Sequence, residues 1–107
     1  MKREPLILAF SQLGIVLRNV GENKPWKNFE IGITEHEYDR LISTISRLKH
    51  HNGWFTEAMV RKAMLNIGRS LDSDLLASWC SKYTFSSQPK TVAVIMAGNI
   101  PLVGFHD

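Results

Sequence analysis

Apolar side chains recur every three or four positions along most of the chain, which is the spacing of one buried helix face. The first such stripe consists of Leu6, Phe10, Leu13 and Leu17. Pro5 suits the first turn of a helix, where its missing N–H is not needed, and Gly21 lies where a C-terminal glycine cap belongs. The pattern therefore predicts a helix from about Pro5 to Val20.

Three further helices are predicted from apolar stripes, and the first two of them also have a polar start signal. Thr34 and Glu37 have the spacing of a capping box, and this second helix should end at Asn52. Thr56 is the expected cap of the third helix, and a short fourth helix should begin near Ser73. The apolar stripes are Tyr38, Leu41, Ile42, Ile45 and Leu48, then Val60, Ala63, Met64, Ile67 and Leu71, then Leu75, Leu76, Trp79 and Tyr83. Short connections between these helices predict antiparallel neighbours.

Two pairs of aromatic residues lie outside the predicted helices. Trp26 and Phe29 belong to the loop between residues 21 and 34, and a disordered linker would rarely contain two aromatic residues so close together. These two residues and Ile31 are therefore expected to be pinned against the helices. Trp54 and Phe55 are expected to pack in the core between helices, with contact to a lipid or an acyl chain as the alternative.

The helical period ends near Tyr83, and a different pattern follows. Thr91 to Met96 is an uninterrupted, β-rich apolar run, which is typical of a strand buried on both faces of a parallel sheet. Ala97-Gly98-Asn99 reads as a turn, and Pro101 suits the start of another helix. Together these segments are the first half of a βαβ unit, which takes about 30 residues or more. Because the chain stops inside that unit, we expect the sequence to be part of a longer protein.

This reading gives a domain organisation and a fold class. Residues 1–86 form an N-terminal helical segment, and residues 87–107 form the first strand and turn of a truncated α/β domain. The 107 residues are therefore expected to be mostly α, with about four helices, one β-strand and the start of a helix.

Composition and charge narrow the function classes. The 13 Lys and Arg residues give a formal charge of only +3 and are interleaved with acids along the chain, which argues against nucleic-acid binding. No apolar run approaches the roughly 20 residues of a membrane helix, and the N-terminus does not match a signal peptide. With a single cysteine, Cys80, no disulfide can form within the chain. We therefore expect a cytoplasmic protein without a membrane span.

Few residues are candidates for chemistry on their own pattern. Cys80 has no histidine at a helpful helical spacing, which favours a small helix residue over a nucleophile. His50 and His51 point to different faces of a helix and lack further ligands, so a solvated helix end is favoured over a metal site. Asn99, judged from its local pattern alone, is a turn residue.

The tail changes the interpretation of Asn99. Val94 to Asp107, VIMAGNIPLVGFHD, resembles the segment that opens the cofactor-binding domain of bacterial acyl-CoA reductases, the family of the luminescence fatty-acid reductase. Three shorter upstream segments are similar to the same family, in the same order. They are Ala9-Phe10 with Leu13-Gly14, Asn52-Gly53-Trp54-Phe55-Thr56, and Trp79 with Tyr83.

The resemblance implies an activity, a cofactor and site residues. It implies an aldehyde-dehydrogenase-like α/β fold for the full-length protein, which would reduce a fatty acyl-CoA to an aldehyde with NADPH, through a thioester on a cysteine that is absent from these residues. Asn99 occupies the place of the asparagine whose side-chain amide stabilises the oxyanion. The backbone of Ile95, Met96, Ala97 and Gly98 would line the nicotinamide side of the cofactor. Acyl-transfer or synthetase proteins are possible partners of the full-length enzyme.

The sequence also lacks two features that such an enzyme could have, a dinucleotide fingerprint and the catalytic cysteine. The turn is not the dinucleotide fingerprint Gly-x-Gly-x-x-Gly, and the 107 residues alone are expected to be inactive. The alternative is a small helical interaction module without catalysis. An exposed, unpaired apolar strand promotes aggregation, so a complete small protein would rarely end with one. The tail therefore favours part of an enzyme over a complete small interaction module.

Overall fold

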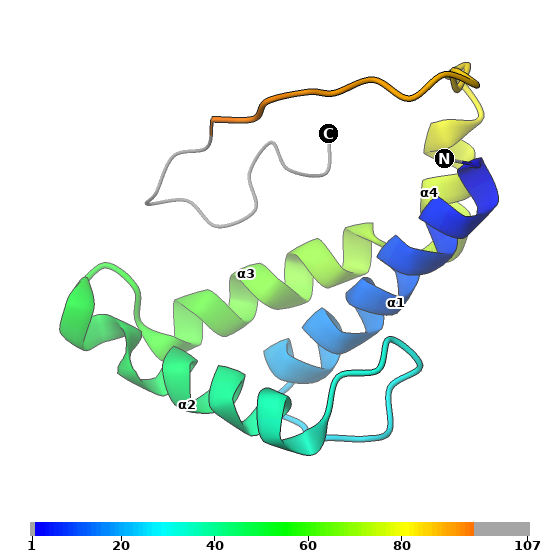
Figure 1. Cartoon of the computed structure of the whole chain (residues 1–107). Coiled ribbons are helices and arrows are strands. Elements are labelled where there is room, and N and C mark those ends of the chain that lie inside the picture. Colours follow the sequence, from blue (N-terminus) through cyan, green and yellow to red (C-terminus); the bar gives the residue numbers. More distant parts are fainter. Residues whose placement is uncertain (1, 96–107) are drawn as a thin grey trace.

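The computed structural model describes residues 2–95, and within that range the chain forms four α-helices (Figure 1). The helices are α1 (Arg3–Gly21), α2 (Glu35–His51), α3 (Glu57–Ser70) and α4 (Ser73–Cys80). The number of helices, their order and their approximate bounds confirm the prediction from the apolar pattern. After α2, α3 returns alongside α1 in the opposite direction, and α4 lies near the start of α1 (Figure 1).

Polar side chains begin three of the helices. At α2 the backbone N–H of Glu37 donates to the Thr34 hydroxyl at 3.3 Å, and the Thr34 N–H donates to the Glu37 carboxylate at 2.9 Å. This is the predicted capping box. The Thr56 hydroxyl accepts from the third residue of α3, and Asp72 accepts from two N–H groups of α4. Each cap satisfies N–H groups that the first helical turn leaves without partners.

The main core lies where α1, α2, α3 and the loop before α2 meet. Its buried members are Val16, Val20, Phe29, Tyr38, Ile45 and Val60. The rings of Phe29 and Tyr38 lie 5.7 Å apart, and Trp26 donates to the Ile33 carbonyl at 3.0 Å. The prediction that the apolar loop residues are pinned against the helices is therefore confirmed for Trp26 and Phe29 and wrong for Ile31, which is 44% exposed.

Of the two aromatic residues between α2 and α3, one packs against the core and the other lies on the surface. Phe55 is partly buried and packs against the core, as predicted, whereas Trp54 is 91% exposed, so the core prediction for Trp54 is wrong. The turn explains the difference. The Trp54 N–H donates to the Asn52 side chain at 3.0 Å, and the Phe55 N–H donates to the Asn52 carbonyl at 3.0 Å. This tight turn places Trp54 at its tip and returns the chain inward at Phe55.

Glycines allow α1 and α3 to approach closely. A Cβ atom at Gly68 would lie 2.8 Å from the carbonyl oxygen of Gly14, and one at Gly14 would lie 3.0 Å from that of Gly68. A Cβ atom at Gly21 would lie 2.8 Å from the Arg61 carbonyl oxygen. Gly21 is therefore a packing residue inside α1, and its predicted role as a cap is wrong. Asn23, with φ of 56°, takes the left-handed conformation after the helix.

The predicted strand is not formed within residues 2–95. Thr91 to Ile95 belong to an irregular segment after α4, shown in orange in Figure 1, and Met96 lies beyond the described part. A strand needs a neighbour for its backbone hydrogen bonds, and no other segment of the described part supplies one. Val92, Val94 and Ile95 are 76%, 58% and 100% exposed. The described part is thus all-α, and the α/β fold of a full-length protein stays a prediction.

Candidate functional site

The site residues implied by the tail lie at and beyond the edge of the described chain. Ile95 is fully exposed, and its backbone belongs to no helix or strand. Met96, Ala97, Gly98 and Asn99 fall outside the described residues. Their roles in holding a cofactor and stabilising an oxyanion therefore stay predictions.

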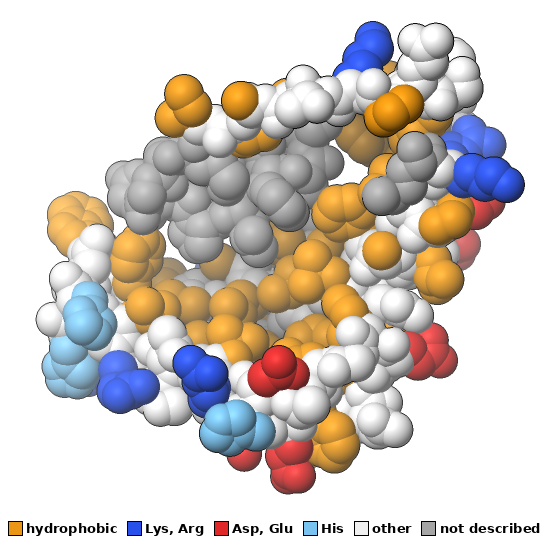
Figure 2. All heavy atoms as spheres, viewed as in Figure 1, with side chains coloured by type: hydrophobic (Ala, Val, Ile, Leu, Met, Phe, Trp, Pro, Cys, Tyr) orange, Lys and Arg blue, Asp and Glu red, His pale blue; other side chains and the backbone are white. Residues whose placement is uncertain are grey.

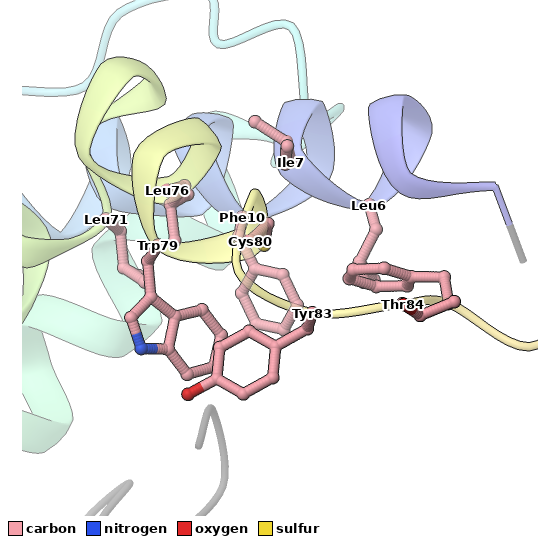
Figure 3. Close-up of a pocket in the computed structure, with 10 residues that line it drawn as sticks. Leu6, Ile7, Phe10, Leu71, Leu76, Trp79, Cys80, Tyr83 and Thr84 are labelled. Atoms are coloured by element: carbon pink, nitrogen blue, oxygen red, sulfur yellow. The ribbon is translucent and has the colours of Figure 1, made fainter.

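The described part contains an apolar groove that was not predicted from the sequence. It lies between the first turns of α1, helix α4 and the segment after α4, and its volume is about 360 Å³ (Figure 3). We call it the α1–α4 groove. Its principal walls are Leu6, Phe10, Leu76, Trp79, Tyr83 and Phe85. A groove of this size is at the lower end of the range of small-molecule sites, about 300–1,000 Å³.

The unequal lengths of two helices create the groove. Helix α1 has 19 residues, whereas α4 has only eight and is the nearby helix beside the first turns of α1 (Figure 1). The stripe that starts with Leu6 and Phe10 is predicted as core, but both residues are only partly buried. Eight residues provide about two turns of helix, which is too little apolar surface to cover them.

The end of α4 builds the aromatic wall of the groove. The Tyr83 N–H donates to the Cys80 carbonyl at 3.1 Å, so the chain turns directly after the helix. This turn brings the Tyr83 ring to 5.0 Å from that of Trp79, at an interplanar angle of 54° (Figure 3). Trp79 and Tyr83 remain 44% and 54% exposed. Their stripe is predicted as a buried helix face, and that prediction is wrong for these two residues.

The groove has binding chemistry and no acid–base chemistry of its own. The described residues that line it include no carboxylate, imidazole or ammonium group. Cys80 also lines the groove, but its side chain is buried and has no histidine beside it in the lining, which agrees with a structural residue. The arrangement can hold an apolar ligand, and it supplies no catalytic pair.

The other candidates from the sequence do not assemble a site. His50 and His51 are exposed at the end of α2, and residues 2–95 contain no group of three or more His, Cys, Asp or Glu side chains placed to bind a metal. The carboxyl groups with shifted pKa values are those of Glu22, after α1, and Glu37, at the start of α2. Neither residue lines the groove.

A signal for the groove is present in the sequence in retrospect. Three large aromatic residues lie within seven positions at the end of a helix, just before a Ser- and Pro-containing loop. They are Trp79, Tyr83 and Phe85. So many rings exceed what a helix of two turns can bury. The missing information was the length of α4, because helix ends are the least certain part of a pattern-based prediction.

Comparison with family models, with curated proteins and with solved structures found no match for this chain. No helix within residues 2–95 is both long and apolar enough to cross a bilayer. The family interpretation therefore depends on the sequence segments described above.

Proposed function

We propose that this chain is the N-terminal helical part of an NADPH-dependent acyl-CoA reductase that forms an aldehyde. The observation that carries the proposal is the series of segments that resemble this family in order along the chain. The series ends in the tail from Val94 to Asp107, which contains Asn99. A lone Gly-Asn-x-Pro turn would be weak support, whereas the long tail together with Asn52-Gly53-Trp54-Phe55-Thr56 is more specific.

The chemistry assigns Asn99 a defined task. A cysteine thiolate of the longer protein would attack the acyl carbonyl and displace the coenzyme A thiolate, which takes up a proton, so that an enzyme thioester forms. NADPH would supply a hydride to the thioester carbonyl carbon, the carbon–sulfur bond would break, and the products would be the aldehyde, NADP+ and the free cysteine thiolate. Negative charge develops on the carbonyl oxygen during the attack, and a fixed amide donor at that position contributes about 3–4 kcal/mol of stabilisation.

The exposure of the tail supports the proposal. Val92, Val94 and Ile95 present apolar side chains to solvent at 76%, 58% and 100% exposure. When an apolar, β-rich segment of this kind forms a strand, it is normally covered on both faces by helices and paired with neighbouring strands. A larger α/β domain would provide both.

The test is an activity assay on the product of the whole reading frame that contains these residues. We expect purified protein to oxidise NADPH when given a long-chain acyl-CoA and to release the aldehyde. Asn99→Ala should lower kcat by about 10²–10³-fold, the usual cost of removing one oxyanion donor. The control is Asn28→Ala, an exposed loop position, which should leave kcat unchanged. Absence of reduction by the folded protein would refute the proposal, and full activity of Asn99→Ala would refute the role of that residue.

An interaction module without catalysis is the second candidate, and the exposed apolar tail favours it, with Val92, Val94 and Ile95 at 76%, 58% and 100% exposure. The two candidates differ in what the tail contacts. An interaction module would use it to bind a partner protein, whereas in a reductase it would pair with strands of the same chain. The assay above separates them, because a module does not consume NADPH.

A further inference from the structure

We infer that the α1–α4 groove binds the hydrocarbon chain of a long-chain acyl-CoA, with the anionic end of the ligand at the start of α1. The identity of the ligand rests on the proposed function, and the assignment of the groove rests on its own geometry and charge. The inference adds a place where this helical part contacts the substrate, separate from the tail that contains Asn99.

The walls of the groove match a flexible alkyl chain. Trp79 and Tyr83 form one side with their tilted rings, and Phe10 faces them from α1 (Figure 3). A hydrocarbon chain gains from apolar contact along its length and needs no hydrogen-bond partner. A polar ligand would find few partners here, because most of the described lining residues are hydrocarbon or aromatic.

The charges near the groove match an anionic head group. Arg3 precedes Leu6 by three positions and Ile7 by four, so it lies on the same face of α1 as these lining residues. Lys2 adjoins Arg3, and Lys82 directly precedes Tyr83. Figure 2 shows Lys and Arg side chains at the end of the molecule where α1 begins.

The acidic side chain among these cations is that of Glu4, 3.9 Å from Arg3. Lys2 and Arg3 against Glu4 leave the start of α1 with a net positive charge, and the positive end of the α1 dipole adds to it. Phosphates of a coenzyme A moiety are complementary to such a rim.

The size of the groove favours an acyl chain over a protein segment. About 360 Å³ suits a small ligand. A docked helix is about 10–12 Å wide with its side chains, and a stable protein interface buries at least about 1,000 Å². The groove alone is too small for either. We therefore place the alkyl chain inside the groove and the nucleotide part of the ligand outside it, against the cationic rim.

Calorimetric titration of the purified chain with dodecanoyl-CoA, coenzyme A and dodecanoate tests the inference. We expect dodecanoyl-CoA to bind about tenfold or more tightly than either component, because it alone uses both the apolar walls and the phosphate contacts. The double variant Trp79→Ser/Tyr83→Ser should weaken dodecanoyl-CoA binding by about tenfold or more. Both side chains are partly exposed, so the fold should persist, and circular dichroism checks this.

The control is Trp54→Ser, which removes a 91% exposed aromatic side chain at the α2–α3 turn, at the other end of the helical pair (Figure 1). It should leave the affinity unchanged. Arg3→Glu with Lys82→Glu should weaken dodecanoyl-CoA severalfold and reduce the dependence of its affinity on salt. Retained affinity in the Trp79/Tyr83 double variant, or coenzyme A binding as tightly as dodecanoyl-CoA, would overturn the inference.

Two outcomes separate this inference from the proposed function. Acyl-CoA binding at the groove, without reduction by the whole reading-frame product, keeps the groove assignment and refutes the reductase. Reduction by that product, with a KM unchanged by Trp79→Ser/Tyr83→Ser, keeps the reductase and refutes the groove assignment. A dimer in size-exclusion chromatography that these two substitutions convert to monomer would make a second copy the occupant and overturn the inference.

Discussion

At the residue scale, Arg61 is a charged side chain that is buried with hydrogen-bond partners for its guanidinium group. Its guanidinium donates to the Val20 carbonyl at 2.6 Å, near the end of α1, and to the Glu57 carboxylate at 2.8 and 3.0 Å. Arg18 of α1 donates in the other direction, to the Gly68 carbonyl of α3 at 2.5 Å. The pair links two antiparallel helices through carbonyl groups near their C-terminal ends, and the Val20 carbonyl also accepts from the Asn23 N–H at 3.1 Å.

Arg61→Met should lower the free energy of unfolding by about 1–3 kcal/mol, because it removes the hydrogen bonds of a buried guanidinium to the Val20 carbonyl and the Glu57 carboxylate. Lys62→Met is the matched control at an exposed neighbour in the same helix and should change stability by less than about 0.5 kcal/mol. Urea unfolding followed by circular dichroism measures both. Equal stability of the two variants would show that the Arg61 hydrogen bonds contribute nothing net.

Glu37 provides a pH test of the α2 capping box. Hydrogen bonds from the Thr34 N–H at 2.9 Å and from the Thr34 hydroxyl at 2.8 Å hold the pKa of Glu37 below its ordinary value of 4.5. Since the folded-state pKa is the lower one, the carboxylate stabilises the fold above about pH 4.5. That contribution is lost as the pH falls through the folded-state pKa.

Glu37→Gln should therefore reduce the acid sensitivity of the melting temperature below pH 4.5. The control Glu35→Gln, at an exposed position in the same turn, should retain it. Glu22, whose pKa is lowered by a hydrogen bond with Lys24, leaves a residual acid dependence in all three proteins. Melting curves at a series of pH values decide the matter. If Glu37→Gln and the parent chain lose stability in parallel, the capping carboxylate is not the cause.

The α2 capping box could be predicted from the sequence, whereas the hydrogen bonds of Arg18 and Arg61 could not. The reason is how far apart the partners lie along the chain. Thr34 and Glu37 are three positions apart, so their spacing alone identifies the capping box. Arg61 contacts a carbonyl 41 positions away, and Arg18 one 50 positions away. Such partners are defined only once the helices are placed beside each other.

At the element scale, the contact of α1 with α3 depends on the missing side chains of its glycines. A helical Gly14 is expected to weaken α1 by up to about 1 kcal/mol relative to alanine. Helix packing offsets this cost. Because Gly14 and Gly68 have no side chains, the backbones of α1 and α3 can approach each other closely. Helix propensity and helix packing therefore oppose each other at these positions, and packing decides.

Gly68→Ala should destabilise the fold by about 1–3 kcal/mol, although alanine is the better helix former, because the added methyl group meets backbone atoms that cannot move away easily. Its Cβ would lie 2.8 Å from the Gly14 oxygen and 2.9 Å from the Arg18 backbone nitrogen. Gly53→Ala meets no atom within 4 Å and should be close to neutral. Thermal unfolding compares the two variants. A stabilised Gly68→Ala protein would mean that α1 and α3 are further apart than described.

Helix α4 is the element for which local pattern was least informative. Its predicted start near Ser73 agrees with the structure. Its stripe of Leu75, Trp79 and Tyr83, however, is exposed at 58%, 44% and 54%. Periodicity reports that a face is apolar and does not report what covers it. The α1–α4 groove is the consequence, and the pattern of apolar positions did not predict it.

At the scale of the whole molecule, residues 2–95 form a helical unit in which the first three helices share a core and the last helix adds the groove. The helical class, order and approximate bounds followed from the sequence because each depends on local spacing. The strand at Thr91 did not form in the described part, because pairing depends on a partner that local sequence does not supply. Asn99 and the cofactor residues after Ile95 remain predictions.

The purified 107-residue chain should not reduce acyl-CoA with NADPH. The only cysteine in the sequence is Cys80, whose side chain is 5% exposed and has no histidine beside it in the groove lining. Aldehyde formation by this material, at a rate above that of a Cys80→Ala control, would show that the thioester chemistry does not need a cysteine outside these residues.

We have proposed that these residues are part of a longer acyl-CoA reductase, and the first test is to read the coding DNA past the Asp107 codon. We expect an open frame of several hundred further codons that encodes strands alternating with helices and a cysteine able to form the thioester. A stop codon directly after Asp107 would contradict it, and the chain would then have to act, with its α1–α4 groove, as a binding protein without the reductase chemistry.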